Sequence, residues 1–243
     1  MIVQHNMTAL NANRQLGITN TNLARSTEKL SSGYRVNRAA DDAAGLSISE
    51  KMRGQIRGLE QASTNAEDGQ SLIQTAEGAL SEIHSVLQRM RELTVQASND
   101  TNVSADRKAI AKEVRALTSE INRIATQTQF NTMGLLSGGF KNKKLQVGAN
   151  TNQTISITIS SMTAGKLGVS ATVIAKVISS STGKDITKLI TTVNTAITKV
   201  STQRSALGAL QNRLDHTIAN ADNMAENLQS SESKIRDVDM ADE

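Results

Sequence analysis

Residues 66–97 read AEDGQSLIQTAEGALSEIHSVLQRMRELTVQA, and this stretch decides the fold. Its small and apolar residues recur at alternating steps of three and four: Ala66, Gly69, Ile73, Ala76, Leu80, Ile83, Leu87, Met90, Thr94 and Ala97. This heptad spacing places them on one face of a helix, as in a coiled coil. A second row beside the first repeats every seven residues: Leu72, Ala79, Val86 and Leu93. The pattern predicts a helix from about Ala62 to Ser98, roughly 55 Å long, and its two rows indicate more than one packing neighbour.

The sequence after this helix predicts a turn and a second helix. Residues 99–102 read NDTN, which is typical of a polar turn. Ser104 is a suitable helix cap, and Asp106 falls in the first turn, where an acid complements the helix dipole. The apolar row of this helix again advances by three and four residues: Ile110, Val114, Leu117, Ile121, Ile124 and Thr128. The glycine-containing stretch 130–139 then ends the helical pattern.

The middle of the chain changes from helical spacing to alternation of apolar and polar residues. The turn-rich stretch 148–152 separates two short alternating runs, whose apolar members are Leu145, Val147, Ile155, Ile157 and Ile159. This arrangement predicts a β-hairpin. Because an isolated hairpin is marginally stable in water, it should pack on the helices. Residues 169–177 are ambiguous, and a further short strand is one interpretation of them.

The last third of the chain predicts another long helix. Residues 182–185 read TGKD, a Thr-x-x-Asp start signal. Polar residues interrupt the apolar row at Arg204, Gln211 and Glu232. The simpler interpretation is that the row reaches the surface there; the alternative is that buried polar residues fix the helix register at a cost in stability. The row itself consists of Ile186, Ile190, Val193, Ile197, Val200, Leu207, Leu214, Ile218, Ala221, Ala225, Leu228 and Ile235.

The first 40 residues carry a weaker helical pattern. Leucines repeat every seven residues at 16, 23 and 30, and asparagines do so at 6, 13 and 20. The apolar face formed by Leu16, Leu23 and Leu30 is thin, and asparagine is a modest helix former. We therefore predict that residues 1–40 are disordered unless an oligomer or another partner covers them.

Together these patterns predict a mainly α fold, an elongated antiparallel helical bundle (a coiled-coil-like rod) with a small β-hairpin element. The composition agrees, because the 243 residues include no proline, which would break helices, and only one tyrosine and two phenylalanines. With so few aromatic residues, burial must come from thin layers of aliphatic side chains.

Composition also excludes several classes of protein. Without cysteine there is no disulfide framework, no thiolate nucleophile and no cysteine-ligated metal. No run of apolar residues is long enough for a transmembrane helix, and residues 1–6 lack the features of a secretory signal peptide. The net charge of +4 comes from interspersed charges of both signs, so it does not predict nucleic-acid binding.

A search for catalytic chemistry yields no catalytic, metal-binding or cofactor-binding residue. The three histidines are widely separated and form no metal-ligand pair. Ser26 and Lys29 fit a Ser-x-x-Lys pattern, but no companion motif supports a nucleophile. Asp41 and Asp42 either ligate a cation or, in the interpretation we favour, complement the dipole of a helix that begins near Ala43.

Several long motifs resemble those of bacterial flagellins. Residues 30–49, LSSGYRVNRAADDAAGLSIS, closely resemble the N-terminal signature of that family. The segments LGALQNRL at 207–214 and IRDVDMA at 235–241 match its C-terminal signature. Shorter matches are NMTALNA at 6–12, TQTQFN at 126–131, LQVGAN at 145–150 and ISI at 155–157.

The resemblance implies a structural role as the subunit of the flagellar filament outside the cell, exported unfolded through the flagellar type III apparatus. It implies that residues 1–40 are an inner-tube segment, that 41–178 are the N-terminal part of the core rod and that 179–243 are its C-terminal helix. Expected partners are other copies of the chain, through Leu16, Leu23 and Leu30, and the flagellar junction and cap proteins. No cofactor and no membrane contact are expected.

The sequence ends at Glu243. Flagellins typically continue with a further helix that pairs with the N-terminal helix and that the export chaperone binds. The resemblance therefore leaves chaperone binding and filament assembly by this chain open.

A second implied function concerns residues 87–93, LQRMREL, which resemble the flagellin segment recognised by Toll-like receptor 5. Gln88, Arg89 and Leu93 match the receptor contacts, and Glu113 matches the acidic contact on the next helix. Arg89 and Leu93 share a helix face because they are four residues apart, and an arginine beside an exposed leucine is a plausible hot spot. In a filament, Arg89 and Leu93 are expected to contact a neighbouring subunit instead.

Two alternatives remain at this point. A hook–filament junction protein of the same superfamily shares the terminal helices but not the full signature around 39–46. A basic coiled-coil protein that binds nucleic acid would show steep salt dependence of binding.

Overall fold

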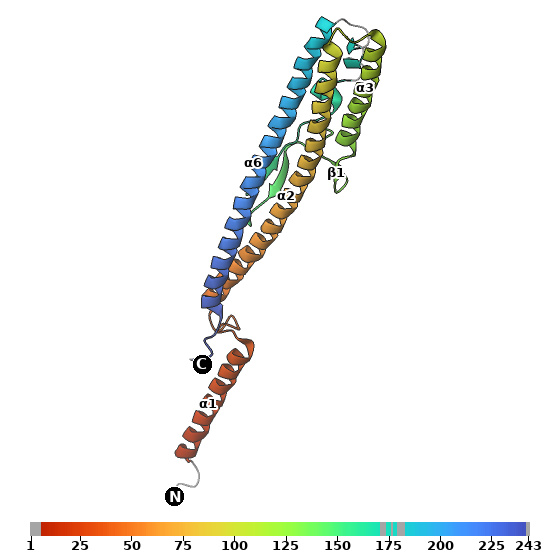
Figure 1. Ribbon diagram of the computed structural model, residues 1–243. Coiled ribbons are helices and arrows are strands. Elements are labelled where there is room, and N and C mark those ends of the chain that lie inside the picture. The colour runs from red at the N-terminus through yellow and green to blue at the C-terminus, as the bar shows by residue number, and fades with distance from the viewer. Residues whose placement is uncertain (1–5, 171–173, 176, 179–182, 242–243) are drawn as a thin grey trace. The chain divides into compact units, whose positions relative to one another are not determined.

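The computed structural model describes residues 6–170, 174–175, 177–178 and 183–241 (Figure 1). They fold into two compact units, Ala62–Asn220 and Met1–Gln61 with Ala221–Glu243. The prediction of a mainly α fold with a pair of long packed helices and a small β-hairpin is confirmed.

Three helices form the frame of the unit Ala62–Asn220. They are α2 (Ala43–Ser98), α3 (Ser104–Gln127) and α6 (Gly183–Arg236), of which α2 and α6 also extend into the other unit. Within Ala62–Asn220, α2 lies beside both α3 and α6 and runs antiparallel to them (Figure 1). Because α2 has two neighbouring helices, both of the apolar rows predicted for it have a packing partner.

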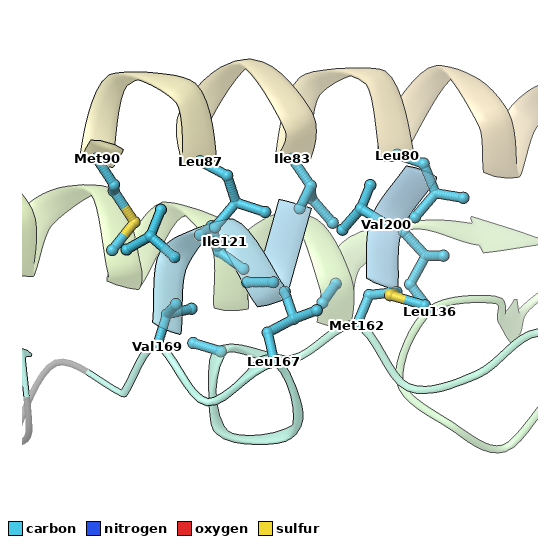
Figure 2. Close-up of a cluster of buried hydrophobic side chains, with 14 of the residues drawn as sticks. Leu80, Ile83, Leu87, Met90, Ile121, Leu136, Met162, Leu167, Val169 and Val200 are labelled. Carbon is cyan, nitrogen blue, oxygen red and sulfur yellow. The ribbon is translucent and has the colours of Figure 1, made fainter. Parts of the chain in front are cut away.

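The main apolar row of α2 is the centre of the core. All ten of its predicted members, from Ala66 to Ala97, are buried. Figure 2 shows Leu80, Ile83 and Leu87 pointing from α2 toward Ile121 of α3 and Val200 of α6. The prediction of this buried helix face is confirmed, because heptad spacing keeps one face turned toward the partner helices.

The two predictions for the start of α2 differ in outcome. The helix begins at Ala43, as the interpretation of Asp41 and Asp42 predicted, and not near Ala62, where the heptad pattern placed its start. Its buried face continues upstream through Ser49, Ile56 and Leu59, so there is no break in packing where the prediction placed one. At the N-terminal end, the Asp42 carboxylate accepts a hydrogen bond of 2.8 Å from the backbone N–H of Gly45, so Asp42 caps the helix from just before its first turn.

The N-terminus of α3 also differs from the prediction. Val103 is the cap residue and Ser104 is the first helical residue. The Asp106 carboxylate accepts a hydrogen bond of 3.2 Å from the backbone N–H of Val103. Asp106 therefore supplies the acceptor for the free N–H of Val103 at the helix end, whereas Ser104, the predicted cap, does not. The buried residues of α3 are Ile110, Ala111, Val114, Thr118, Ile121 and Ala125.

Two short antiparallel pairs of strands follow α3. Strands β1 (Gln129–Phe130) and β2 (Met133–Gly134) form the first pair, and β3 (Lys143–Gln146) and β4 (Thr154–Ile157) form the predicted hairpin. Leu145 is opposite Ile155, whereas Val147 and Ile159 lie just outside the strands. The hairpin packs on α2, where the Asn65 side chain donates a hydrogen bond of 3.2 Å to the Gln146 carbonyl.

The segment after the hairpin is helical where it is described. Helix α4 (Ala164–Leu167) buries Leu167 in the core. Residues 174–175 and 177–178 are also helical, so the possible strand at 169–177 is wrong for these positions. Ile174, Ala175 and Ile178 are fully buried. A short run of apolar residues fits a buried helix as well as a strand, and periodicity alone does not separate them.

Helix α6 supplies the other long side of the core. Val193, Val200, Leu207 and Leu214 are buried, as the spacing predicted. The predicted start signal at Thr182 lies outside the described residues. The interpretation that the row reaches the surface at its polar members is wrong for Glu232, whose side chain is only 12% exposed.

The N-terminal segment is one helix, α1 (Met7–Ser32), which belongs to the other unit. The prediction that residues 1–40 are disordered by themselves is therefore wrong for the described part of this segment. Local signals suffice for the helix: the Asn6 side chain accepts a hydrogen bond from the Ala9 N–H, and Gly33 ends the helix with a φ of 72°.

Candidate functional site

Helix α1 presents an apolar row that none of the described residues covers. None of its 26 residues is buried. Leu16 and Leu23 are each 62% exposed, and Leu30 lies one heptad further along the same face. An exposed leucine row along a whole helix is typical of surfaces that associate with another protein.

The loop between α1 and α2 is held by hydrogen bonds among its own residues. The Asp41 carboxylate accepts hydrogen bonds from the backbone N–H groups of Arg38 and Asn37, at 2.9 and 3.2 Å. The bond from Arg38 is the main reason that the pKa of Asp41 lies below its ordinary value. The Arg38 guanidinium also pairs with Glu28 of α1. These bonds fix the chain direction on leaving α1.

The same loop is joined to the C-terminal end of the chain. The backbone N–H of Arg35 donates to the Arg236 carbonyl at 2.7 Å, and the N–H of Val238 donates to the Gly33 carbonyl at 3.0 Å. The Arg236 guanidinium lies 4.7 Å from the centre of the Tyr34 ring, a cation–π contact. Segments some 200 positions apart are thereby tied together.

A polar cluster consists of Ser49, Glu50 and Arg53 of α2 with Glu232 and Arg236 of α6. Glu232 accepts hydrogen bonds from Arg53 at 2.9 Å and from the Ser49 hydroxyl at 3.0 Å. Arg236 pairs with Glu50 at 2.8 Å. Although burial opposes it, the charge of Glu232 raises the pKa of Arg53. Glu232 thus interrupts an apolar row because it has a partner on the facing helix.

Replacing Glu232 by alanine is expected to lower the free energy of unfolding by about 1–3 kcal/mol, because Arg53 and Ser49 would lose their partner in a largely covered site. Urea unfolding followed by circular dichroism measures this. The matched control is Glu226→Ala, an exposed glutamate on the same helix, for which a change within about 0.5 kcal/mol is expected. Equal effects of the two changes would contradict the role given to the cluster.

The face shared by α2 and α3 carries a network of ion pairs around Arg89. Arg89 pairs with Glu113 of α3 and with Glu92 of its own helix, both at 3.0 Å. The hydrogen bonds from Arg89 to Glu92 and Glu113 raise the pKa of the guanidinium. Gln88 is exposed one residue earlier and lies 3.0 Å from the His84 ring nitrogen. Gln88, Arg89 and Glu113 therefore lie together on one exposed polar surface.

Leu93 does not belong to that exposed surface. Its side chain is only 2% exposed and is part of the core. The prediction of an exposed leucine beside Arg89 is wrong, because the second row of α2 packs inside the three-helix unit. A partner that contacts Arg89 would therefore touch polar atoms and the aliphatic part of the arginine side chain. It would not touch Leu93, which is buried.

The comparison with known proteins decides the family. Residues 3–141 match the bacterial flagellin N-terminal helical region, and residues 190–243 match the bacterial flagellin C-terminal helical region. The chain belongs to the bacterial flagellin family.

Named relatives agree over the whole chain. A flagellin of Halalkalibacterium halodurans is 52% identical over 249 residues, a match that spans 100% of this chain and 88% of that protein. The Bacillus subtilis flagellin is 48% identical over 271 residues, spanning 100% of this chain and 89% of that one.

Two solved structures share the fold. The crystal structure of Bacillus cereus flagellin matches with a TM-score of 0.54 at 30% identity, covering 68% of this chain and 94% of that chain. A putative flagellar hook-associated protein from Vibrio parahaemolyticus has a TM-score of 0.69, covering 81% of this chain and 100% of that chain. At 13% identity, the second likeness shows the fold alone.

In this flagellin the two family signatures meet. The N-terminal signature contains Tyr34, Arg35 and Ser49, and the C-terminal signature contains Arg236. These residues make the contacts described above between the two ends of the chain. Sequence reasoning paired the two ends of the chain in one helical bundle but did not identify these residue contacts, for which the polar interruption of the α6 row at Glu232 was a signal.

No group of three or more histidine, cysteine or carboxylate side chains suited to a metal ion occurs among the described residues of this flagellin. The helices in the same part of the chain include none long and apolar enough to cross a bilayer. Flagellins are a structural protein family, so the surfaces of interest are contact surfaces.

Proposed function

We propose that this chain is a structural subunit of the bacterial flagellar filament outside the cell and that it assembles with copies of itself. The observation that carries the proposal is the uncovered α1 helix, whose leucines at 16, 23 and 30 are left in water by a single chain. Covering such a row supplies the free energy for association, since burial of a leucine contributes roughly 1.5–3 kcal/mol. Residues 1–40 are the proposed inner-tube segment.

The partners follow from this role. The growing filament joins flagellar junction and cap proteins, which are proposed partners of its end subunits. We propose export in an unfolded state through the flagellar type III apparatus; the absence of cysteine, and hence of disulfides, supports this. The chain itself could instead be a junction protein, but the flagellin matches at both ends of the chain favour the filament subunit.

Seeded elongation tests the proposal. The purified chain is added to sheared fragments of flagellin filaments, and filament length is followed by electron microscopy. Elongation from the fragments is the expected result. A chain that stays in the supernatant at every concentration while a known flagellin elongates the same fragments would overturn the assignment.

A second proposed function is recognition by Toll-like receptor 5 through Gln88, Arg89 and Glu113. The supporting observation is that these three side chains are exposed together and that Arg89 is held in place by two carboxylates. A pre-organised arginine loses little conformational freedom on binding. The same surface, with Leu93 beneath it, is proposed to face a neighbouring subunit in the filament, which leaves it free only on monomers.

Arg89→Asp is expected to weaken receptor activation at least about tenfold, because the substitution reverses a charge at the centre of the surface. Reporter cells that express the receptor measure the half-maximal dose of monomeric protein. Arg115→Asp is the matched control, since it makes the same charge change at an exposed site on the neighbouring helix α3. Activation by the Arg89 variant at the parent's dose would contradict the assignment.

Nucleic-acid binding is disfavoured by the charge arrangement. Six arginines pair with carboxylates, which offsets their charge: Arg38, Arg53, Arg89, Arg123, Arg204 and Arg236. Retardation of the chain's migration by DNA, lost steeply with salt, would reverse this conclusion.

A further inference from the structure

His84 lies on α2 at the edge of the core, beside the polar surface around Arg89. Its side chain is half-buried. Leu80, four residues earlier, and Leu87, three residues later, lie on the same side of the helix, and both are fully buried. Because one side of the imidazole ring is covered, His84 has less freedom to reorient than the exposed side chains next to it.

The Gln88 side chain is hydrogen bonded to this ring. Its amide nitrogen lies 3.0 Å from Nε2 of His84. Residues four apart lie one above the other on a helix, and helical side chains lean toward the N-terminus, so the Gln88 amide extends back over His84. The bond therefore sets the direction of an exposed side chain that otherwise samples many rotamers.

The second nitrogen of the ring has no such bond. With the Gln88 amide as the donor, Nε2 accepts and the ring proton is on Nδ1. Nδ1 of His84 is buried and has no hydrogen-bond partner among the described residues. A buried N–H without an acceptor is rare in folded proteins and lowers their stability. Such departures from local rules occur mainly at functional sites, and here the departure accompanies the ordering of a surface residue.

We propose that His84 is a positioning residue for recognition by Toll-like receptor 5 and that it holds the Gln88 amide in the orientation that the receptor binds. The inference rests on the proposed receptor function of Gln88, Arg89 and Glu113. Arg89 is held by two carboxylates and Gln88 by the His84 ring, so two adjacent side chains of that surface are ordered before binding. Ordered side chains lose less conformational freedom when a partner binds.

His84→Leu tests the role of the ring nitrogen. Leucine keeps an apolar side chain at the edge of the core and favours a helix at least as well as histidine, but it cannot accept a hydrogen bond. The half-maximal dose for receptor activation is expected to rise about two- to tenfold. His216→Leu, the same change at an exposed histidine of α6, is the matched control and should activate as the parent does.

His84→Asn is the conservative variant. Asparagine and glutamine four residues apart form a hydrogen bond on a helix, so activation within about twofold of the parent is expected. A loss as large as that of His84→Leu would contradict a role for the hydrogen bond.

The Gln88→Ala background shows whether His84 acts through Gln88. If it does, adding His84→Leu to Gln88→Ala causes no further loss of activation, because the positioned side chain is already absent. A further loss equal to that of His84→Leu alone would mean that His84 acts independently of Gln88, and the positioning role would be wrong.

Nuclear magnetic resonance relaxation measures the positioning without the receptor. The side-chain amide signal of Gln88 is identified by its absence from the spectrum of the Gln88→Ala variant. Its order parameter is expected to fall below about 0.6 in His84→Leu and to stay at the parent's value in His216→Leu. Equal order parameters in the parent and His84→Leu would overturn the proposal.

The two hypotheses can fail separately. If Arg89→Asp loses activation while His84→Leu keeps the parent's dose, the receptor function stands and the positioning role is wrong. If Arg89→Asp keeps the parent's dose, the receptor function is wrong, and the order parameter alone decides whether His84 holds Gln88.

Discussion

Leu23→Asp is expected to abolish filament elongation while leaving the chain folded. Leu23 lies in the middle of the exposed α1 row and contacts no core. In the proposed assembly it becomes buried, and an unpaired carboxylate there costs about 3–5 kcal/mol, which corresponds to a loss of roughly 150- to 5,000-fold in association. Seeded elongation measured by sedimentation and electron microscopy checks this result.

The matched control is Thr21→Asp, which adds the same charge about 160° around the helix from Leu23. It is expected to elongate nearly as the parent does. Both variants should unfold within about 1 kcal/mol of the parent, since the cost of aspartate in an exposed helix is small. Elongation by the Leu23 variant at the parent's rate would remove α1 from the interface. A large loss of stability in that variant would show that the leucine row packs within the chain.

Leu93→Ala is expected to lower the free energy of unfolding by about 2–5 kcal/mol, as cavities in well-packed cores do. The reason is its burial in the three-helix unit at only 2% exposure. Circular dichroism during urea unfolding measures the effect, since the chain has no tryptophan to report it. Val95→Ala, two residues further along on an exposed part of α2, is the control and should change stability by no more than about 0.5 kcal/mol.

This result bears directly on receptor recognition. A weaker response from the Leu93 variant would reflect a loosened unit as well as any lost contact, whereas Arg89→Asp changes only the exposed surface. If Leu93→Ala unfolds like the parent, the leucine is not part of the core in solution, and a direct receptor contact becomes the better interpretation.

The buried face of α2 could be predicted from sequence because the heptad row is long and has no exception between Ala66 and Ala97. Alternation of apolar and polar residues likewise predicted the hairpin, whereas its register, with Leu145 opposite Ile155, came from the structure. It failed at Val103, where a valine caps a helix, and at 169–177, where a short apolar run carries no period long enough to separate helix from strand.

The sequence by itself determined the long helices, the buried faces of α2, α3 and α6 and, through long motifs, the family. These features depend on neighbours within about seven positions, and local spacing records them. Only the tertiary structure decided that Leu93 is covered and Arg89 is not, and that Glu232 meets Arg53 and Ser49. The burial of Leu93 and the pairing of Glu232 depend on which residues from distant parts of the chain pack against the helix face that carries them. A periodic row of apolar residues predicts that a helix has an apolar face. How much of the helix surface becomes buried depends on how many helices pack against it. For α2 that number is two within the unit Ala62–Asn220, whereas no residue of α1 is buried by the part of the chain that the structure describes.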